Sequence, residues 1–348
     1  MKITQIMLAK GFGGAERYFV DLSVALAEQG HDVQAICHRR FCERARLMKI
    51  PALQIDTFSP LGWWDLIAGK RIENSIGRFG PAVVHAHLAR GACMAGRACA
   101  RLGIPLVAKT HNYVDLKYYR HVDCFIATTH SQEQYLVRQG IAPERIRIIP
   151  NFSSQPPAEK VKTSRKEPMQ FVTYGRLVRK KGFHILLESF RRYLDQGYRA
   201  YLVIGGDGPE SETLREQCRA LQLEPFVTFS GWVTDIEDFM KHADVFVLPS
   251  LDEPFGIAVL EAMALGVPII ATTTDGPREI LDTQTAFLVS PGDVELLASA
   301  MVDARDDLLR REKASSALRL FRNKYSKAVV VTSLMQLYGS MRDNHEIR

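Results

Sequence analysis

The sequence predicts an α/β protein made of two parallel sheets, each with helices on both faces. Short apolar runs alternate with amphipathic stretches of helical spacing along the whole 348-residue chain. The alternation stops at a segment rich in proline and charge, residues 153–168, and then starts again. At about 100–200 residues per domain, a chain of this length is expected to hold two domains.

The first half opens with a strand, a glycine turn and a helix. Lys2 to Leu8 is an apolar run, Gly11-Phe12-Gly13-Gly14 is the turn, and Ala15 to Gln29 carries apolar residues at helical spacing. Gly30 ends this helix, and Asp32 to Cys37 is the next expected strand. Further strands are expected over residues 81–87, 105–110 and 123–128.

The same pattern resumes after the linker. We expect strands over residues 170–174, 200–204, 226–230, 245–248, 268–271 and 286–289, and helices over 182–194 and 211–221. The predicted domains are therefore residues 1–155 and 169–325, followed by a last helix over 326–348. Open α/β sheets bind ligands beyond the carboxyl ends of their strands, so two facing sheets are expected to form the site in the cleft between them.

Composition excludes several classes of protein. Hydrophobic residues make up 46% and charged residues 24%, an ordinary globular balance. The longest apolar stretch, Gly256 to Ala271, is interrupted by Glu261, so no membrane span is expected, and the first residues lack the order of a signal peptide. The six cysteines form no CxxC pair, which favours reduced thiols and a cytoplasmic location over a disulfide framework or a zinc ribbon.

The positive charge is concentrated in the first half. Residues 1–150 contain 20 Lys and Arg against 12 Asp and Glu, a net charge of +8, whereas the remainder contains 25 against 27, a net charge of −2. This asymmetry predicts an anionic partner for the first half.

The first glycine turn has three interpretations. A turn between a strand and a helix favours a phosphate, because free N–H groups and the helix dipole meet there. Arg39 and Arg40 follow the second strand, where they suit the 2′-phosphate of NADP, so an NADP-dependent oxidoreductase is an alternative on this half alone. A turn needed only for tight packing is the third interpretation.

The second half contains a more specific pattern. Arg176 follows a strand and Lys181 precedes the next helix, and two cations there can neutralise a diphosphate leaving group. Glu253 and Glu261 lie eight residues apart, with the backbone N–H groups of Gly256 and Ile257 between them. Burying Glu261 in an apolar helix is costly without a partner, and a ribose diol is a natural one. The alternatives are a solvated basic loop and a helix with an acidic first turn.

These motifs together resemble the retaining glycosyltransferases of family 4, which have the GT-B fold. Glu253 to Glu261 is similar to the family's EX7E motif, and Gly175-Arg176 with Lys181-Gly182 to its phosphate-binding pair. The chain also matches the family's other signatures at Ile149-Pro150-Asn151, Gly205 to Pro209, Gly231-Trp232-Val233, Ala264 to Pro268, Gly13 to Glu16, His85-Ala86-His87 and Lys109-Thr110-His111.

The resemblance implies two Rossmann-like domains facing across a cleft, with the last helix crossing back onto the first domain. It assigns Glu261 to the donor ribose, Glu253 and His111 to the transferred sugar, and Arg176 with Lys181 to the diphosphate. Further donor contacts implied by it are at Gly13, Gly14, Val233, Phe255, Gly256 and Ile257. It also implies that the leaving phosphate takes the acceptor proton. No metal or other cofactor is expected, since the chain has no Asp-x-Asp pair and the nucleotide sugar is a substrate.

Two further groups of residues each have more than one interpretation. His85 and His87 share a strand face, so a metal pair is sterically feasible, but a hydrogen-bonded structural role is the more common one. Trp63 and Trp64 lie among cations, which fits an interfacial segment or a phosphorylated glycolipid site as well as a short surface helix whose tryptophans pack on the core.

The sequence thus predicts a hexosyltransferase that uses a nucleotide-diphosphate sugar. The nucleotide is expected to be UDP, because UDP-sugars are the more frequent donors in the family, and no nucleic acid is expected as a partner. Its expected acceptor is an anionic glycolipid or saccharide, such as a lipopolysaccharide core precursor, contacted by Glu16, Arg39, Arg40, Trp63 and Trp64 at the inner face of the membrane. The alternatives are the NADP-dependent oxidoreductase and a catalytically silent binder of sugar nucleotides.

Overall fold

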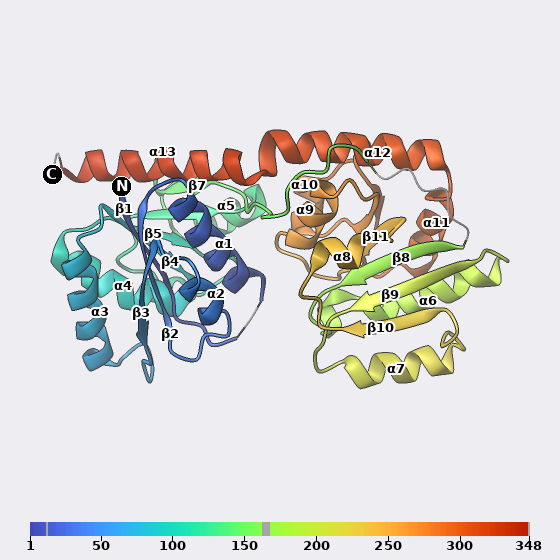
Figure 1. Ribbon diagram of the computed structural model, residues 1–348, viewed down its shortest axis with the longest axis horizontal. Helices are drawn as coiled ribbons and strands as arrows, with labels where there is room; N and C mark the ends of the chain where they lie inside the picture. Colours follow the sequence, from blue (N-terminus) through green and yellow to red (C-terminus); the bar gives the residue numbers. More distant parts are fainter. Residues whose placement is uncertain (12, 162–167, 347–348) are drawn as a thin grey trace. The chain divides into compact units, whose positions relative to one another are not determined.

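The computed structural model describes residues 1–11, 13–161 and 168–346, and these residues form two compact units. Unit 1 consists of residues 1–151 together with the residues from Lys327 onward, and unit 2 of Phe152–Ser326 (Figure 1). The expected first domain ends at residue 155, whereas the structure places residues 152–155 in unit 2. Phe12 and residues 162–167 of the expected linker lie outside the described residues.

Unit 1 contains a seven-stranded parallel sheet in the order β3-β2-β1-β4-β5-β6-β7. Its strands are β1 (Lys2–Met7), β2 (Asp32–His38), β3 (Leu53–Phe58), β4 (Val83–His87), β5 (Leu106–Lys109), β6 (Cys124–Ala127) and β7 (Ile146–Ile148). Its helices are α1 (Gly14–Glu28), α2 (Arg44–Met48), α3 (Leu66–Phe79), α4 (Leu88–Leu102), α5 (His130–Arg138) and α13 (Lys327–Glu346), with 3₁₀ turns η1 (Leu116–Tyr118) and η2 (Pro143–Arg145).

Unit 2 contains a six-stranded parallel sheet in the order β10-β9-β8-β11-β12-β13. Its strands are β8 (Met169–Tyr174), β9 (Ala200–Gly205), β10 (Val227–Gly231), β11 (Val245–Leu248), β12 (Ile269–Thr272) and β13 (Phe287–Val289). Its helices are α6 (Phe183–Asp195), α7 (Ser211–Ala220), α8 (Ile236–Met240), α9 (Ile257–Ala264), α10 (Asp275–Ile280), α11 (Val294–Asp303) and α12 (Asp307–Leu320), with a 3₁₀ turn η3 (Arg179–Lys181) and a π-helical turn η4 (Phe321–Tyr325).

The prediction of two parallel sheets is confirmed, and the strands predicted from apolar runs match observed strands to within two residues at each end. β3 and β7 were not predicted. Both are edge strands of the unit 1 sheet, and only one of the six residues of β3 is fully buried. A strand covered on both faces gives a continuous apolar run, but an edge strand gives a weaker signal.

The last helix completes unit 1. The buried side chains of α13 include Val330, Val331, Leu334 and Tyr338, and the helix contacts α1 and β4. Lys327 at its start forms an ion pair of 2.7 Å with Glu28 at the end of α1. Since Ser326 is still part of unit 2, the chain returns to unit 1 only with this helix. None of the helices among the described residues is both long enough and apolar enough to cross a membrane.

Candidate functional site

The predicted donor-binding residues of unit 2 lie at the carboxyl edge of its sheet. Arg176 follows β8, Val233 follows β10, and Glu253 and Gly256 follow β11. All six strands are parallel, so these loops meet at one edge, where open α/β sheets bind ligands.

Backbone hydrogen bonds tie these loops together. Gly175 donates to the carbonyl of Gly205 at 3.0 Å, and Leu177 on the other side of Arg176 donates to the carbonyl of Asp207 at 2.9 Å. The Arg176 side chain is exposed, and no hydrogen bond or ion pair involves it within the described part of the chain. The loop backbone is therefore fixed while the guanidinium group stays available.

Two ion pairs connect η3 to the loop after β11. Lys181 pairs with Glu253, and the adjacent Lys180 pairs with Asp252 at 3.1 Å. Asp252 and Leu251 also donate backbone hydrogen bonds to the carbonyl of Lys180. The side chains of Lys181 and Glu253 are largely buried, whereas those of Lys180 and Asp252 are about half exposed. Exposed pairs add little stability, so the Lys181–Glu253 pair is the one that fixes the two loops.

Gly182 permits this close approach. Its φ is +69°, and a Cβ atom there would lie 1.9 Å from the carbonyl oxygen of Pro249. Any other residue would therefore both strain the backbone and collide with the end of β11.

Glu261 has a partner that the sequence did not reveal. It is buried within α9, and the hydroxyl group of Tyr174 donates a hydrogen bond to its Oε2. Tyr174 ends β8, and its ring contacts those of Phe239 and Phe246. The burial of Glu261 therefore does not by itself require a ligand, which corrects the argument made from its apolar flanks. Tyr174 could have been suspected only from its place directly before Gly175-Arg176.

Gly256 caps the N-terminus of α9 and has a left-handed backbone. No side chain among the described residues caps this helix; the N–H of Val259 already bonds to the carbonyl of Gly256, which leaves the N–H groups before it for an acceptor. Ile257 begins the helix, while the side chain of Phe255 is buried in the core and leaves only its backbone for binding. Val233 is half-buried and packs on the same core.

In unit 1, three histidines lie close together: His85 and His87 in β4, and His111 after the neighbouring strand β5. The rings of His85 and His87 stack with centroids 4.4 Å apart, and His87 Nδ1 lies 3.0 Å from His111 Nε2. Burial lowers the pKa of His87 to about 3 and holds that of His111 well below its usual value, with Lys109 adding to both shifts. All three rings are thus neutral at physiological pH, since the pKa of His85 is also lowered by burial.

His85 and His87 each also contact a side chain outside the three histidines. His85 Nδ1 lies 2.6 Å from the hydroxyl of Tyr338, and His87 Nε2 lies 2.8 Å from Gln5 Oε1. The described residues contain no group of three His, Cys, Asp or Glu side chains placed to hold a metal ion. The structural interpretation of the His85–His87 pair is the one that these contacts support.

Lys109 is a buried lysine beside this cluster. Its Nζ donates to the hydroxyl of Tyr18 at 3.2 Å and to the carbonyls of Ile149 and Pro150 at 3.1 and 3.2 Å. It also lies 4.2 Å from the centre of the Tyr18 ring. Desolvation holds the pKa of Lys109 well below its usual value. This lysine therefore holds Ile149 and Pro150, near the end of the first segment of unit 1 (residues 1–151), and does not face solvent.

The glycine turn and the arginines lie at the carboxyl edge of the unit 1 sheet. Gly13 caps α1, Gly14 begins it, and Glu16 lies in its first turn. Arg39 and Arg40 are exposed directly after β2, and the backbone N–H of Arg39 donates to the carbonyl of Phe58 at the end of β3. They are therefore close to the loop that leads from β3 to α3.

That loop and the start of α3 carry an exposed apolar patch. It consists of Leu61, Trp63, Trp64, Leu66 and Ile67, whose exposed fractions are 81%, 48%, 57%, 73% and 71%. Neither tryptophan packs into the core, and both precede α3, so of the two alternatives the surface helix with core-packed tryptophans is wrong. The ring of Trp63 contacts Tyr118 and has Arg97 over its face at 5.9 Å. Apolar side chains gathered in this way indicate an interaction surface.

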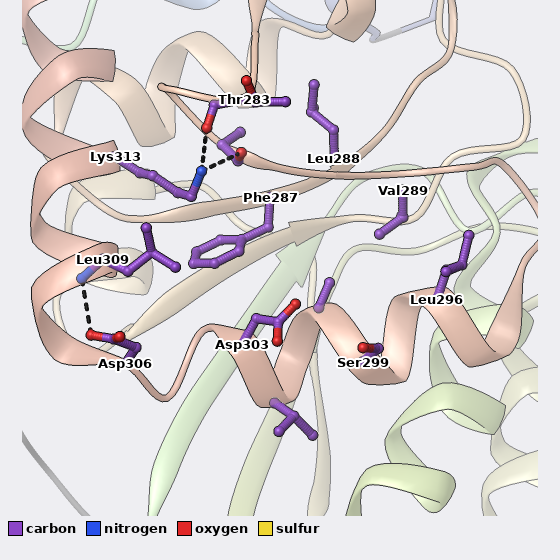
Figure 2. A pocket seen from close by; sticks show the side chains of 13 residues that line it. Thr283, Phe287, Leu288, Val289, Leu296, Ser299, Asp303, Asp306, Leu309 and Lys313 are labelled. Atoms are coloured by element: carbon purple, nitrogen blue, oxygen red, sulfur yellow. Dashed lines mark hydrogen bonds between the residues drawn. The ribbon is translucent and has the colours of Figure 1, made fainter.

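A separate cavity in unit 2 lies away from all of these residues. It has a volume of about 530 Å³ and is lined by β13, α11 and α12 (Figure 2). Its cation, Lys313, donates to the carbonyls of Thr283 and Ala286, and desolvation lowers its pKa. No predicted site residue lines this cavity.

Comparisons with known proteins cover both units. Residues 12–152 match the family model described as Glycosyltransferase Family 4, and residues 154–320 match Glycosyl transferases group 1. The lipopolysaccharide core biosynthesis glycosyltransferase LpsE of Rhizobium meliloti is 29% identical over 98% of this chain and 99% of its own. LpsD of the same organism, which carries the same description, is 29% identical over 94% of this chain and 95% of its own. The crystal structure of Anabaena HepE with UDP has a TM-score of 0.83 at 19% identity, over 98% of this chain and 100% of that one.

Proposed function

This chain belongs to the family 4, group 1 glycosyltransferases with the GT-B fold, and we propose that it transfers a hexosyl unit from a UDP-sugar to a cell-envelope glycolipid. The observation that carries the proposal is what meets at one edge of the unit 2 sheet: the Lys181–Glu253 pair, together with an Arg176 side chain and a start of α9 that no side chain of the described residues pairs with or caps. Because both halves of the chain match glycosyltransferase family models, the alternative of an NADP-dependent oxidoreductase is not supported.

Two comparisons support the donor and acceptor classes. HepE was crystallised with UDP, and the relatives LpsE and LpsD are described as acting in lipopolysaccharide core biosynthesis. We therefore propose a UDP-sugar as the donor and a lipopolysaccharide core precursor as the acceptor for this chain. We propose the cytoplasmic face of the membrane as the place of the reaction. The transferred sugar is a hexose.

In the proposed reaction, the bond between the anomeric carbon and the diphosphate oxygen breaks while an acceptor oxygen bonds that carbon on the same face. Attack on the same face retains the configuration, the acceptor proton passes to the leaving diphosphate, and the proposed reaction uses no metal or other cofactor. Arg176, Lys181 and the first N–H groups of α9 stabilise the charge that develops on the diphosphate. By resemblance, Glu261 binds the ribose, Glu253 and His111 bind the sugar, Val233 and Phe255 border the nucleotide, and Gly13 with Gly14 assist the diphosphate.

UDP is expected to stabilise the protein against thermal unfolding, and Glu261→Gln is expected to remove most of this effect. A ligand at a hundredfold excess over its Kd adds about 2.7 kcal/mol to the free energy of unfolding. Differential scanning calorimetry with and without UDP measures the shift. Glu212→Gln, an exposed carboxylate on α7, is the control that should keep it.

The same sample distinguishes an enzyme from a silent binder. Release of UDP from UDP-hexoses, with or without acceptor, is expected to continue in a metal chelator. Protection by UDP without any release would leave a silent binder, and strict dependence on added magnesium would contradict the metal-free reaction.

We also propose that the apolar patch holds the enzyme on an anionic membrane surface. Tryptophan and leucine side chains enter the lipid interface, while the basic excess of residues 1–150, with Arg39 and Arg40, attracts anionic headgroups. Each cation near such a surface contributes about 1 kcal/mol. This contact would bring the enzyme to a lipid-linked acceptor.

Co-sedimentation with vesicles tests this contact. Binding is expected to require anionic lipid, to weaken with salt, and to fall strongly in the Trp63→Ala/Trp64→Ala double variant. Replacing the exposed Trp232 of unit 2 by alanine is the matched control and should change nothing. Failure to bind anionic vesicles at low salt would overturn the membrane contact and leave the transferase proposal intact.

A further inference from the structure

A buried chain of hydrogen bonds in unit 1 links the last helix to His111. The hydroxyl of Tyr338, on α13, contacts both His85 Nδ1 at 2.6 Å and Gln5 Nε2 at 3.5 Å. Gln5 Oε1 lies 2.8 Å from His87 Nε2, and His87 Nδ1 lies 3.0 Å from His111 Nε2. All five side chains are buried; β1 and β4 pair Gln5 with His85, and His111 follows β5, which pairs with β4.

These hydrogen bonds have a donor-to-acceptor direction, which can be followed from Gln5. Gln5 Nε2 donates to the Tyr338 hydroxyl, so the amide oxygen of Gln5 faces His87. An amide oxygen only accepts, and His87 must therefore carry its proton on Nε2. Because the pKa of His87 is about 3, its ring is neutral and its Nδ1 has only a lone pair.

The same logic continues to His111. A bare Nδ1 on His87 can only accept, so His111 must donate from Nε2. His111 is neutral as well, which leaves its own Nδ1 unprotonated, and this nitrogen makes no hydrogen bond among the described residues. The backbone of His111 is left-handed, with φ +64°, so the residue is held by its surroundings.

Tyr338 carries the direction from Gln5 on to His85. Its oxygen accepts from Gln5, and its proton is then available for His85 Nδ1. His85 Nε2 is buried without a partner among the described residues, so the series of hydrogen bonds ends at His85. A tyrosine hydroxyl can donate as well as accept, so this direction holds while the Tyr338 oxygen accepts from Gln5 and its proton goes to His85. Without the hydroxyl, Gln5 loses this link to His85, and its amide is free to turn its NH₂ group toward His87, which would reverse the protonated nitrogen on His87 and on His111.

We propose that Tyr338 is a positioning residue that acts through Gln5 and His87 to make His111 present an unprotonated Nδ1, a hydrogen-bond acceptor for a hydroxyl group of the transferred sugar. The part of this inference that concerns the sugar rests on the proposed function of His111. The part that concerns the proton on His111 does not.

The tautomer is tested by NMR of protein labelled with ¹⁵N-histidine, with the three rings assigned by replacing each with glutamine. In the unchanged protein His111 is expected to be protonated on Nε2 alone, and in Tyr338→Phe to become a mixture of both tautomers. A proton on Nδ1 of His111 in the unchanged protein would overturn the proposal, as would an unaltered spectrum of His111 in Tyr338→Phe.

Kinetics test the consequence for catalysis. Tyr338→Phe is expected to lower kcat about 10- to 100-fold with little change in KM for the UDP-sugar, because binding remains and orientation is lost. Val331→Ala removes buried packing from the same helix but no hydroxyl, and it should lower the Tm while keeping kcat. Equal loss of kcat in both variants would indicate mere loosening of α13 and would overturn the proposal.

Two further measurements keep the test decisive. Gln5→Met removes the next group along the chain, so its effect and that of Tyr338→Phe should not add in the double variant. It also replaces Tyr338→Phe if that variant fails to fold. If the unchanged protein releases no UDP from any UDP-hexose, the proposed function fails, and the NMR comparison still decides the role of Tyr338.

Discussion

Replacing Arg176 by alanine is expected to lower kcat for sugar transfer about 10²–10³-fold, the usual loss when one group that stabilises transition-state charge is removed. The Tm should not change, because the side chain is exposed and has no ion pair or hydrogen bond in the part of the chain that the structure describes. Steady-state release of UDP, measured beside a thermal unfolding curve, shows whether the two effects separate in this way.

Arg179→Ala is the matched control for this variant. Arg179 lies three residues further along, in η3, and is also exposed. If the basic loop acted only through its summed charge, both variants would lose the same activity. A clear loss in Arg176→Ala alone is what a directed contact with the diphosphate requires.

The Gly182→Ala variant is expected to destabilise unit 2 by about 3 kcal/mol or more, a loss typical of strain combined with overpacking. Its Cβ atom would lie 1.9 Å from the Pro249 carbonyl oxygen, and its φ of +69° adds about 1–2 kcal/mol of left-handed strain. The loop would have to move away from the end of β11 and would separate Lys181 from Glu253. Urea unfolding gives the change in the free energy of unfolding.

Gly197→Ala isolates the strain from the collision. Gly197 has a similar φ of +86°, but a Cβ atom there meets nothing within 4 Å. Its loss should be limited to the strain, about 1–2 kcal/mol. Equal losses in the two variants would contradict the close approach of η3 and β11.

The sequence predicted the strands that are covered on both faces and missed those at one sheet's edges. β11 is a run of four buried residues and is identified at once, whereas β3 alternates and includes Gln54 and Asp56. A strand that is buried on both faces of the sheet gives a continuous run of apolar residues in the sequence. The fold class follows from such central strands.

The partners of the site residues could not be predicted in the same way. Lys181 and Glu253 are 72 residues apart, Tyr174 and Glu261 are 87 apart, and His85 and Tyr338 are 253 apart. Motif spacing indicates which residues are used, but a contact between distant segments depends on the packing of the whole sheet. The internal partner of Glu261 shows how such a contact changes the interpretation of a buried carboxylate.

The position of α13 has a consequence for how the protein is made. A ribosome completes residues 1–151 and then all of unit 2 before it reaches Lys327, so the nascent first domain spends that time without its closing helix. The surfaces of α1 and β4 that α13 covers stay open to chaperones during translation, and Tyr338 reaches His85 only after α13 has been synthesised. The domain that is synthesised first is therefore the last to finish folding.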